Sequence, residues 1–427
     1  MRSGREGRFI EPVPYQDQLL LSFHDIKIMD LHQENLAKQL GDKNRLVRGV
    51  AGSGKTLILA SRAKLLTKEH PDWKVLVLCY NISLAQNIKN MVDHMMNGPE
   101  SLFDFDFGNE EAGQNAKVHH ITVRNFHAWL KHGLKISEYQ IPDIIQKLEN
   151  NEAILPKYDA ILIDEGQDFA SDWLKLVGLL LNPETKSLLL VEDRAQNIYK
   201  RKRSYVQDTG LDFRGRSKIL NINYRNTSQI VKFAWDFYES HSILKNKVVK
   251  REAEGVEIIS PLSTRRKGPE PVLYYANNFK EEMAKIAQII TFLHHKKNVP
   301  YSEILILYRV KRTHKLQVMD IIEYTLKGAN FPYYWITKNE HSKRQFDREE
   351  ETIKISTIDS SKGLDFQAVF IVNADNMPFA LEEDKEREAS LLYIGMTRAK
   401  EYLTISYSGI SEYTEYFEEI RKGRLSI

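Results

Sequence analysis

Arg48-Gly49-Val50-Ala51-Gly52-Ser53-Gly54-Lys55-Thr56 is the stretch from which the rest of the chain can be interpreted. It matches the pattern G-x-x-x-x-G-K-[ST] in full. The segment before it, 44–48, is predicted to be a short buried strand, and a segment with apolar residues at helical spacing, 56–66, follows it. Strand, glycine-rich loop and helix in this order bind phosphate, because backbone N–H groups approach an anion closely only where no Cβ intervenes. The positive end of the helix points at the same anion. The stretch therefore predicts a nucleoside triphosphate site.

Different residues of this stretch are expected to bind the phosphates and the metal. Lys55 would reach the β- and γ-phosphates, and the Thr56 hydroxyl would ligate Mg²⁺. A glycine-rich turn that binds nothing is the alternative, and the intact motif in its intact context argues against it. The loop residues expected to wrap the phosphates are Gly49, Ala51, Gly52, Ser53 and Gly54.

The composition is that of an ordinary globular protein, with 427 residues, 42% hydrophobic and 28% charged, which is enough for two or three domains. No apolar run approaches the length of a membrane span, and the run 19–23 is too short for a signal-peptide core. The single cysteine, Cys79, allows no intramolecular disulfide and no multi-cysteine metal site, which fits a reducing cytoplasm. Because the net charge is only +3, nucleic-acid binding would depend on local basic patches.

A second signal is a pair of carboxylates at the end of an apolar segment, 158–163. Parallel sheets bind ligands at the carboxyl ends of their strands. Asp164 would hold Mg²⁺, largely through water, and Glu165 would orient and deprotonate the attacking water. A solvated acidic turn is the alternative for an isolated Asp-Glu pair, but the phosphate-binding loop upstream favours the catalytic interpretation.

Strands and helices alternate in both halves of the chain, which predicts an α/β protein with two open, mainly parallel sheets. We expect the first domain at 29–240 and the second at 271–427. The basic stretch 241–270 would be the linker, and residues 1–28 a tail or the remnant of an upstream domain.

Two clusters in the second half, 357–366 and 391–400, complete a series of motifs. In this order the motifs resemble superfamily 1 helicases of the UvrD/PcrA/Rep type, over roughly residues 28–410. The residues of the motifs are similar to those of helicase halves joined to nuclease-related domains, although no nuclease motif is visible. The resemblance implies two RecA-like domains that bind ATP and Mg²⁺ between them.

The resemblance also implies roles for single residues of the ATP site. A surface glutamine is the alternative for the first of them, and Asp365 stands where the family usually has a glutamate. The implied roles are adenine reading by Gln33, base stacking by Tyr224, a ribose contact by Asp365, coupling of the γ-phosphate to the DNA path by Gln196, a γ-phosphate contact by Arg225, and an arginine finger from the second domain, Arg398.

The two domains would grip single-stranded DNA by backbone contacts and by stacking of bases on aromatic rings. RNA stays open as the strand, since such contacts discriminate poorly between the two. Core packing is the alternative for Tyr80 and Phe126. The candidate strand contacts are Tyr80, Asn81, Phe126, His127, Tyr199 and the basic run 200–203, including Arg201.

Several positions depart from the family pattern. Arg201 replaces an aromatic residue, Asp359 a histidine, and Glu192 and Ala195 also differ. There is no room for the large accessory insertion between Arg309 and Thr357. The expected function is therefore an ATP-dependent helicase or translocase on single-stranded DNA, by resemblance 3′–5′. The alternative is an ATP-driven switch that regulates a partner such as a nuclease. A small-molecule phosphotransferase would leave the second half unexplained.

Overall fold

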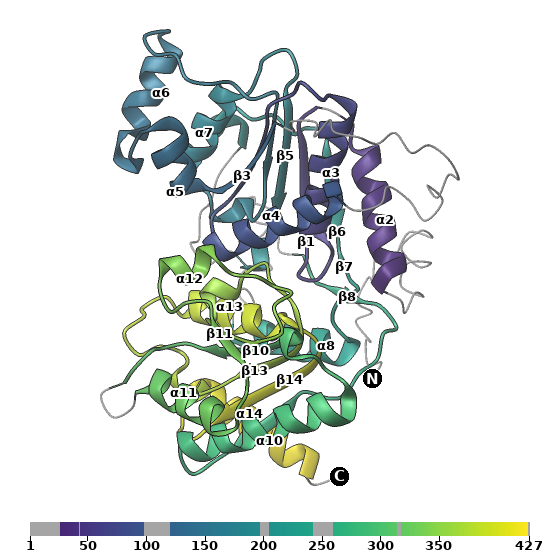
Figure 1. Cartoon of the computed structure of the whole chain (residues 1–427), viewed down its shortest axis with the longest axis vertical. Coiled ribbons are helices and arrows are strands. Elements are labelled where there is room, and N and C mark those ends of the chain that lie inside the picture. The colour runs from purple at the N-terminus through teal and green to yellow at the C-terminus, as the bar shows by residue number, and fades with distance from the viewer. Residues whose placement is uncertain are drawn as a thin grey trace, which may run out of the picture.

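Two parallel sheets, one in each half of the chain, organise the computed structural model, which describes residues 26–41, 43–97, 120–196, 205–241, 259–313 and 317–425. Figure 1 shows the two halves as two bodies stacked along the long axis of the molecule. The sheets confirm the predicted α/β class with open, mainly parallel sheets.

The first sheet has the strand order β3-β2-β4-β5-β1-β6, and all of its pairings are parallel. Two of its inner strands, β2 and β4, read as unbroken apolar runs, as expected where helices cover both faces of a sheet. The strands are β1 (Arg45–Gly49), β2 (Val75–Cys79), β3 (Ile121–Asn125), β4 (Ala160–Ile163), β5 (Ser187–Glu192) and β6 (Ser217–Leu220). The helices around it are α2 (Ile26–Gln39), α3 (Lys55–Glu69), α4 (Ile82–Asn97), α5 (Phe126–Ala128), α6 (Ile141–Glu149) and α7 (Ser171–Leu180).

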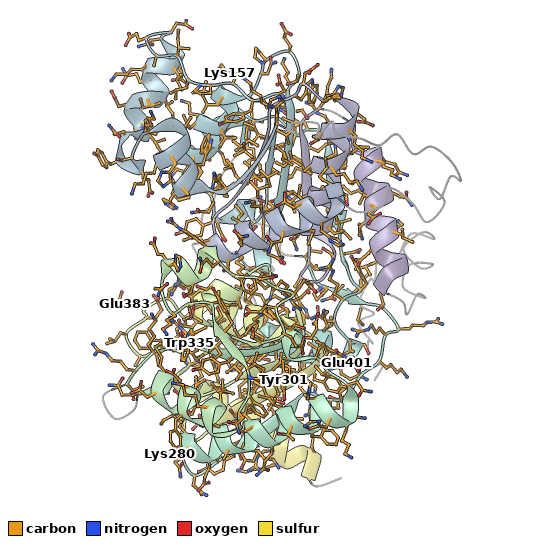
Figure 2. The ribbon with its side chains drawn as sticks, in the orientation of Figure 1. Lys157, Lys280, Tyr301, Trp335, Glu383 and Glu401 are labelled. Carbon is orange, nitrogen blue, oxygen red and sulfur yellow. The ribbon has the colours of Figure 1, made fainter. Side chains whose placement is uncertain are left out.

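The second sheet has the order β11-β12-β10-β13-β14-β9 and is also parallel throughout. Figure 2 labels Trp335 of this body, which is 6% exposed and donates from Nε1 to the Tyr308 hydroxyl at 3.1 Å. The strands are β9 (Val272–Tyr275), β10 (Ile304–Tyr308), β11 (Tyr333–Trp335), β12 (Ile353–Thr357), β13 (Phe366–Ile371) and β14 (Ala399–Tyr407). Its helices are α10 (Phe279–Lys297), α11 (Val318–Gly328), α12 (Glu340–Arg344), α13 (Lys385–Met396) and α14 (Glu412–Leu425).

The helix before the expected linker, α8 (Ser228–His241), packs into the second body although nearly all of it falls within the expected first domain, 29–240. Its buried residues Ile230, Phe233 and Phe237 share one apolar cluster with side chains of the second sheet. Figure 1 shows it among the green and yellow elements of that body. A short parallel pair, β7 (Ile222–Asn223) with β8 (Leu262–Ser263), joins the two sides of the linker. The domain boundaries themselves stay a prediction.

Strand order places the expected site residues at one edge. β4, β5 and β1 are neighbours in the first sheet, so the loop after β1, the acidic pair after β4 and the segment after β5 emerge side by side. That edge faces the second body. Within the described residues, no helix is long and apolar enough to cross a membrane.

Candidate active site

The loop after β1 adopts backbone conformations that favour glycine. Gly52 has φ 66° and Gly54 has φ 81°, both in the left-handed region. A Cβ at Gly52 would lie 2.4 Å from Oδ1 of Asn223, and a Cβ at Gly54 would lie 2.4 Å from the Tyr224 hydroxyl. Both positions therefore need glycine for conformation and for space.

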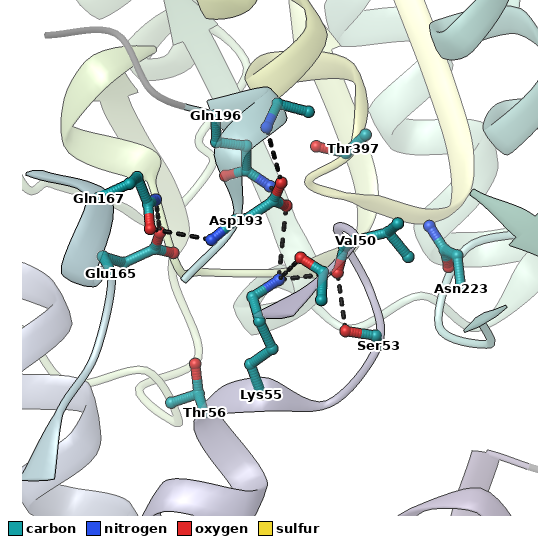
Figure 3. A network of polar contacts seen from close by, with 12 residues as sticks. Val50, Ser53, Lys55, Thr56, Glu165, Gln167, Asp193, Gln196, Asn223 and Thr397 are labelled. Carbon is teal, nitrogen blue, oxygen red and sulfur yellow. Dashed lines mark hydrogen bonds and ion pairs between the residues drawn. The ribbon is translucent and has the colours of Figure 1, made fainter. Parts of the chain in front are cut away.

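The Lys55 side chain turns back into this loop, as Figure 3 shows. Its Nζ donates to the carbonyls of Gly49 at 3.0 Å and Val50 at 2.7 Å, and to Oδ2 of Asp193 at 3.4 Å. Asp193 comes at the end of β5, and burial raises the pKa of its carboxyl. Lys55 is thus ion-paired with a carboxylate of the first body, and its ammonium lies where phosphate oxygens would enter the loop.

The predicted metal ligands Thr56 and Asp164 are in direct contact. The Thr56 hydroxyl donates to Oδ2 of Asp164 at 2.7 Å, and Asp164 is fully buried. Burial and the charge of Glu165 raise the pKa of Asp164 to about 6. A hydroxyl and a carboxylate are oxygen donors of the kind that Mg²⁺ prefers, with phosphate and water completing its shell. The two residues fit the metal, and the described residues hold no group of three or more acidic, His or Cys side chains that would bind one alone.

Glu165 is buried, has φ 53°, and faces cations from both bodies. Nε2 of Gln167 donates to its Oε2 at 2.5 Å, and Nζ of Lys362 lies 3.6 Å from the same oxygen. Burial alone would raise its pKa, but Lys362 and Lys55 outweigh burial and leave the pKa of Glu165 lowered. The carboxylate is therefore ionised at neutral pH and is able to accept a proton.

Gln196 and Arg398 connect the two bodies at this edge. Nε2 of Gln196 donates to Oδ2 of Asp193 at 2.9 Å, and Nη2 of Arg398 donates to Oε1 of Gln196 at 3.4 Å. Arg398 follows α13, is 6% exposed, and also donates to the Leu364 carbonyl at 3.0 Å. Burial lowers the pKa of this guanidinium. A second-body cation thus lies next to the loop, as expected of an arginine finger.

Arg225 is held by two carboxylates. Nη1 donates to Oδ2 of Asp365 at 2.7 Å, and Nη2 donates to Oδ1 of Asp30 at 3.3 Å. Burial would raise the pKa of Asp365, but Arg225 and Lys400 hold it well below its usual range. The expected γ-phosphate contact and the expected ribose contact are therefore paired with each other in this arrangement.

Gln33 and Tyr224, expected at the adenine, both lie against Gly54. Oε1 of Gln33 is buried and has no hydrogen-bond partner within the described part of the chain, so an amide acceptor is available to a ligand. The Tyr224 ring is only 1% exposed, and its hydroxyl donates to Oδ1 of Asp30 at 2.6 Å. Stacking of a base on this ring would require neighbouring side chains to move.

A small cavity of about 50 Å³ lies between the loop and the second body, lined by Lys55, Glu165, Gln196 and Arg398 among others. Ligand pockets usually measure about 300 to 1,000 Å³. The two bodies must therefore separate somewhat to admit a nucleotide.

A second cavity between the bodies, of about 310 Å³, contains several of the expected strand contacts. Nδ2 of Asn81 donates to the Ser360 carbonyl at 3.1 Å, and so joins the two bodies. We call this cavity the interdomain groove. Its lining residues are Tyr80, Asn81, Ile82, Asn125, His127 and Asp168 from the first body and Glu340, Lys343, Asp359, Ser360 and Lys362 from the second.

Phe126 is a correction to the expected strand contacts. Its ring is completely buried and stacks on Trp173 with ring centroids 4.4 Å apart, so it supports the groove from inside the core. Tyr80 stacks on the other side of this aromatic cluster, 6.0 Å from Trp173, and meets His127 edge-on at 5.6 Å. Tyr199 and Arg201 lie outside the described residues.

Comparisons with known proteins match a family model to each of the two bodies. Residues 32–202 match the model of an AAA domain, and residues 219–350 and 336–409 match the model of the UvrD-like helicase C-terminal domain. The chain belongs to the UvrD-like helicases of superfamily 1. The matched segments include the phosphate-binding loop, the acidic pair and the Arg398 turn.

One curated relative is a probable DNA helicase of Mycoplasma pneumoniae (strain ATCC 29342 / M129 / Subtype 1), 25% identical over 339 residues. The match covers 75% of this chain and 58% of that protein, so the chain spans little more than half of its relative. A solved structure, the C-terminal domain of a possible DNA helicase from Lactobacillus plantarum WCFS1, is 18% identical. It covers 43% of this chain and 87% of that one with a TM-score of 0.29, too low to support an argument.

Three residues of the site had no role in the sequence interpretation. They are Asp193, Asp168 and Lys362. Asp193 pairs with Lys55, Lys362 lies next to Glu165, and Asp168 pairs with Lys362. A signal existed for each, because Asp193 and Asp168 lie within quoted motifs and Lys362 lies in the cluster 357–366. The partners of each charge, however, come from segments far apart in the chain.

Proposed function

We propose that the chain hydrolyses ATP between its two bodies and uses the cycle to move along single-stranded DNA in the 3′–5′ direction. The observation that carries the proposal is the meeting of Arg398 with Gln196 beside Lys55 and Glu165. Hydrolysis would then require closure, because one essential cation comes from the other body. Two bodies that close and open around a ligand can turn a chemical cycle into motion.

The chemistry would follow from the named groups. Glu165 accepts a proton from water as the water oxygen bonds to the γ-phosphorus, and the bond from that phosphorus to the β–γ bridging oxygen breaks, leaving ADP. Lys55 and Arg398 would stabilise the charge on the transferring phosphoryl group. Thr56 and Asp164 would hold Mg²⁺, which when bound neutralises phosphate charge. Gln33 would accept a hydrogen bond from the adenine amino group.

The strand would bind in the interdomain groove, with Tyr80 and His127 as stacking surfaces and Lys343 as a phosphate contact. Because both bodies line the groove, its width would change as the ATP site closes. RNA is the alternative strand, a nuclease is the proposed kind of protein partner, and the proposed location is the cytoplasm.

The second candidate function is an ATP-driven switch that signals to a protein partner. It is favoured by Asp359, a carboxylate that lines the groove and would repel strand phosphates. As a switch, the two bodies would close on ATP, the protein partner would recognise the closed form, and no strand would be moved.

ATP hydrolysis measured with and without single-stranded DNA separates the two. We expect strong stimulation by the strand, and loss of hydrolysis in both Lys55→Ala and Arg398→Ala, each by at least about 100-fold. Nucleotide binding should survive in Arg398→Ala, because its guanidinium comes from the opposite body. Hydrolysis that is indifferent to the strand would instead favour the switch.

A further inference from the structure

Asp359 places a carboxylate in the interdomain groove with one oxygen that lacks a hydrogen-bond donor. It begins the short turn Asp359–Ser361, which follows β12, and it lines the groove. Its Oδ1 is buried and has no hydrogen-bond partner within the described residues. A buried acceptor without a donor is unfavourable, so a ligand that brings an N–H or O–H group to this oxygen would be favoured.

Two cations of this region are paired with other carboxylates. Arg309, whose charge interacts with that of Asp359, donates to Oε1 of Glu388 from Nε at 3.1 Å and from Nη2 at 2.6 Å. Lys362 donates to both carboxylate oxygens of Asp168 at 2.8 Å. Asp359 therefore keeps its negative charge, and at this point the groove would repel a phosphate and accept a donor.

The turn that carries Asp359 is fixed against the first body. The Ser360 carbonyl accepts from Nδ2 of Asn81 at 3.1 Å and from the Ser83 hydroxyl at 3.1 Å. Asn81 is next to Tyr80 in the chain, and both Tyr80 and His127 line the groove with Asp359. The unpaired acceptor and the proposed stacking surfaces are thus held in one cavity, of about 310 Å³.

The chemistry of the bases decides which of them suits this acceptor. Proteins that bind single strands stack the bases on aromatic or histidine rings and form hydrogen bonds with their edges. Cytosine presents its N4 amino group, a donor that aspartate accepts, and adenine and guanine also carry amino groups. Thymine presents the O4 carbonyl where cytosine has the amino group, and a carboxylate repels that oxygen.

We propose that Asp359 gives the strand site a base preference, by accepting a hydrogen bond from the amino group of a base stacked in the groove. Strands with amino-bearing bases, cytosine first, are favoured over thymine or uracil strands. The inference rests on the proposed function, because it requires a single strand in this groove. The phosphates lie on the side of Lys343, away from the carboxylate.

The test compares two strands that differ at the base edge and share the same sugar and backbone. Affinities for oligodeoxycytidylate and oligodeoxyuridylate of equal length are measured by fluorescence anisotropy at neutral pH without nucleotide. The wild type should bind the cytosine strand at least about fivefold more tightly. Asp359→Asn keeps the size of the side chain and offers both a donor and an acceptor, so the two affinities should agree within about twofold.

Glu340→Gln is the matched control, because Glu340 lines the same groove and its carboxylate pairs with Arg344 at 3.3 Å. It should change both affinities alike and keep their ratio. Oligouridylate, which adds only the 2′-hydroxyl to the uracil strand, tests whether Asp359 contacts the sugar instead of the base. Tighter binding of oligouridylate that Asp359→Asn abolishes would overturn the base preference.

The remaining outcomes separate the inference from the proposed motor. Equal affinities for the two deoxy strands in the wild type, or an unchanged ratio in Asp359→Asn, would overturn the inference alone. A base preference that depends on Asp359, together with ATP hydrolysis that ignores both strands, would support the inference and overturn the motor. A wild type that binds neither strand would overturn both.

Discussion

At the scale of single residues, the site depends on buried charges whose partners come from both bodies. Glu165 is buried, carries the lowered pKa that Lys362 and Lys55 cause against burial, and has a backbone in the left-handed region. A non-glycine residue in that region costs about 1–3 kcal/mol, which the surrounding packing must offset. Such a cost is common at functional sites, and it fits the role of general base.

Glu165→Gln removes the proton acceptor and keeps the size of the side chain. We expect hydrolysis to fall by roughly 10²- to 10⁴-fold, because general base catalysis contributes about that much. ATP binding should change little, since the phosphates are held by the loop and Lys55. Single-turnover hydrolysis and nucleotide titration measure the two effects, with the exposed Glu184→Gln as the control. A Gln variant that hydrolyses ATP at the wild-type rate would remove Glu165 from the mechanism.

At the scale of elements, Glu282 connects α10 to the second sheet. The side chain is completely buried, and its Oε2 accepts from the Asn373 backbone N–H at 3.1 Å and from the Ser406 hydroxyl at 2.8 Å. Burial raises its pKa from 4.5 to about 7. The folded state therefore binds this proton more tightly than the unfolded state does.

Glu282 makes the free energy of unfolding depend on pH, because the folded state binds its proton more tightly. The contribution of protonated Glu282 to the free energy of unfolding is complete below pH 4.5 and is lost as the pH rises through about 7. Glu282→Gln cannot ionise, so it should be more stable than the wild type at pH 8.5, by roughly 1–3 kcal/mol, and should differ much less at pH 5. Denaturant unfolding at both pH values measures this, with the exposed Glu415→Gln as the control. Equal slopes of stability against pH in the wild type and Glu282→Gln would contradict it.

At the scale of the whole molecule, the segment 223–227 joins the two bodies at the ATP site. The backbone N–H groups of Tyr224 and Arg225 donate to the Gly52 carbonyl in the loop. Nδ2 of Asn226 donates to the carbonyls of Thr397, at 2.9 Å, and Ala399, at 2.6 Å. The segment therefore positions the loop and the Arg398 turn relative to one another.

Asn226→Ala should loosen this joint without unfolding either sheet. It removes the hydrogen bonds from Asn226 Nδ2 to two buried carbonyls, and each loss costs about 1–3 kcal/mol. Hydrogen exchange should become faster at 223–227 and 397–400 and stay unchanged in β2 and β10. Hydrolysis should fall through slower closure, so its dependence on Arg398 should remain. Ser228→Ala, one helical turn or less away, is the control, since within the described residues its hydroxyl hydrogen-bonds only to Oε1 of Gln229. Faster exchange throughout both sheets would mean that the variant is globally destabilised.

The sequence by itself determined the class of the fold, the phosphate-binding loop, and the positions of Thr56 and Asp164 at the carboxyl edge of the sheet. These follow from short-range rules: apolar runs make parallel strands, and motif residues within a few positions of a strand end must emerge at its carboxyl edge. Tertiary structure alone decided which charges face one another, including Lys362 with Asp168, Arg225 with Asp365, and Arg398 with Gln196. It also placed Phe126 in the core and α8 in the second body. Such partners come from strands and turns more than a hundred residues apart, and only the packing of the two bodies against each other brings them within hydrogen-bond distance.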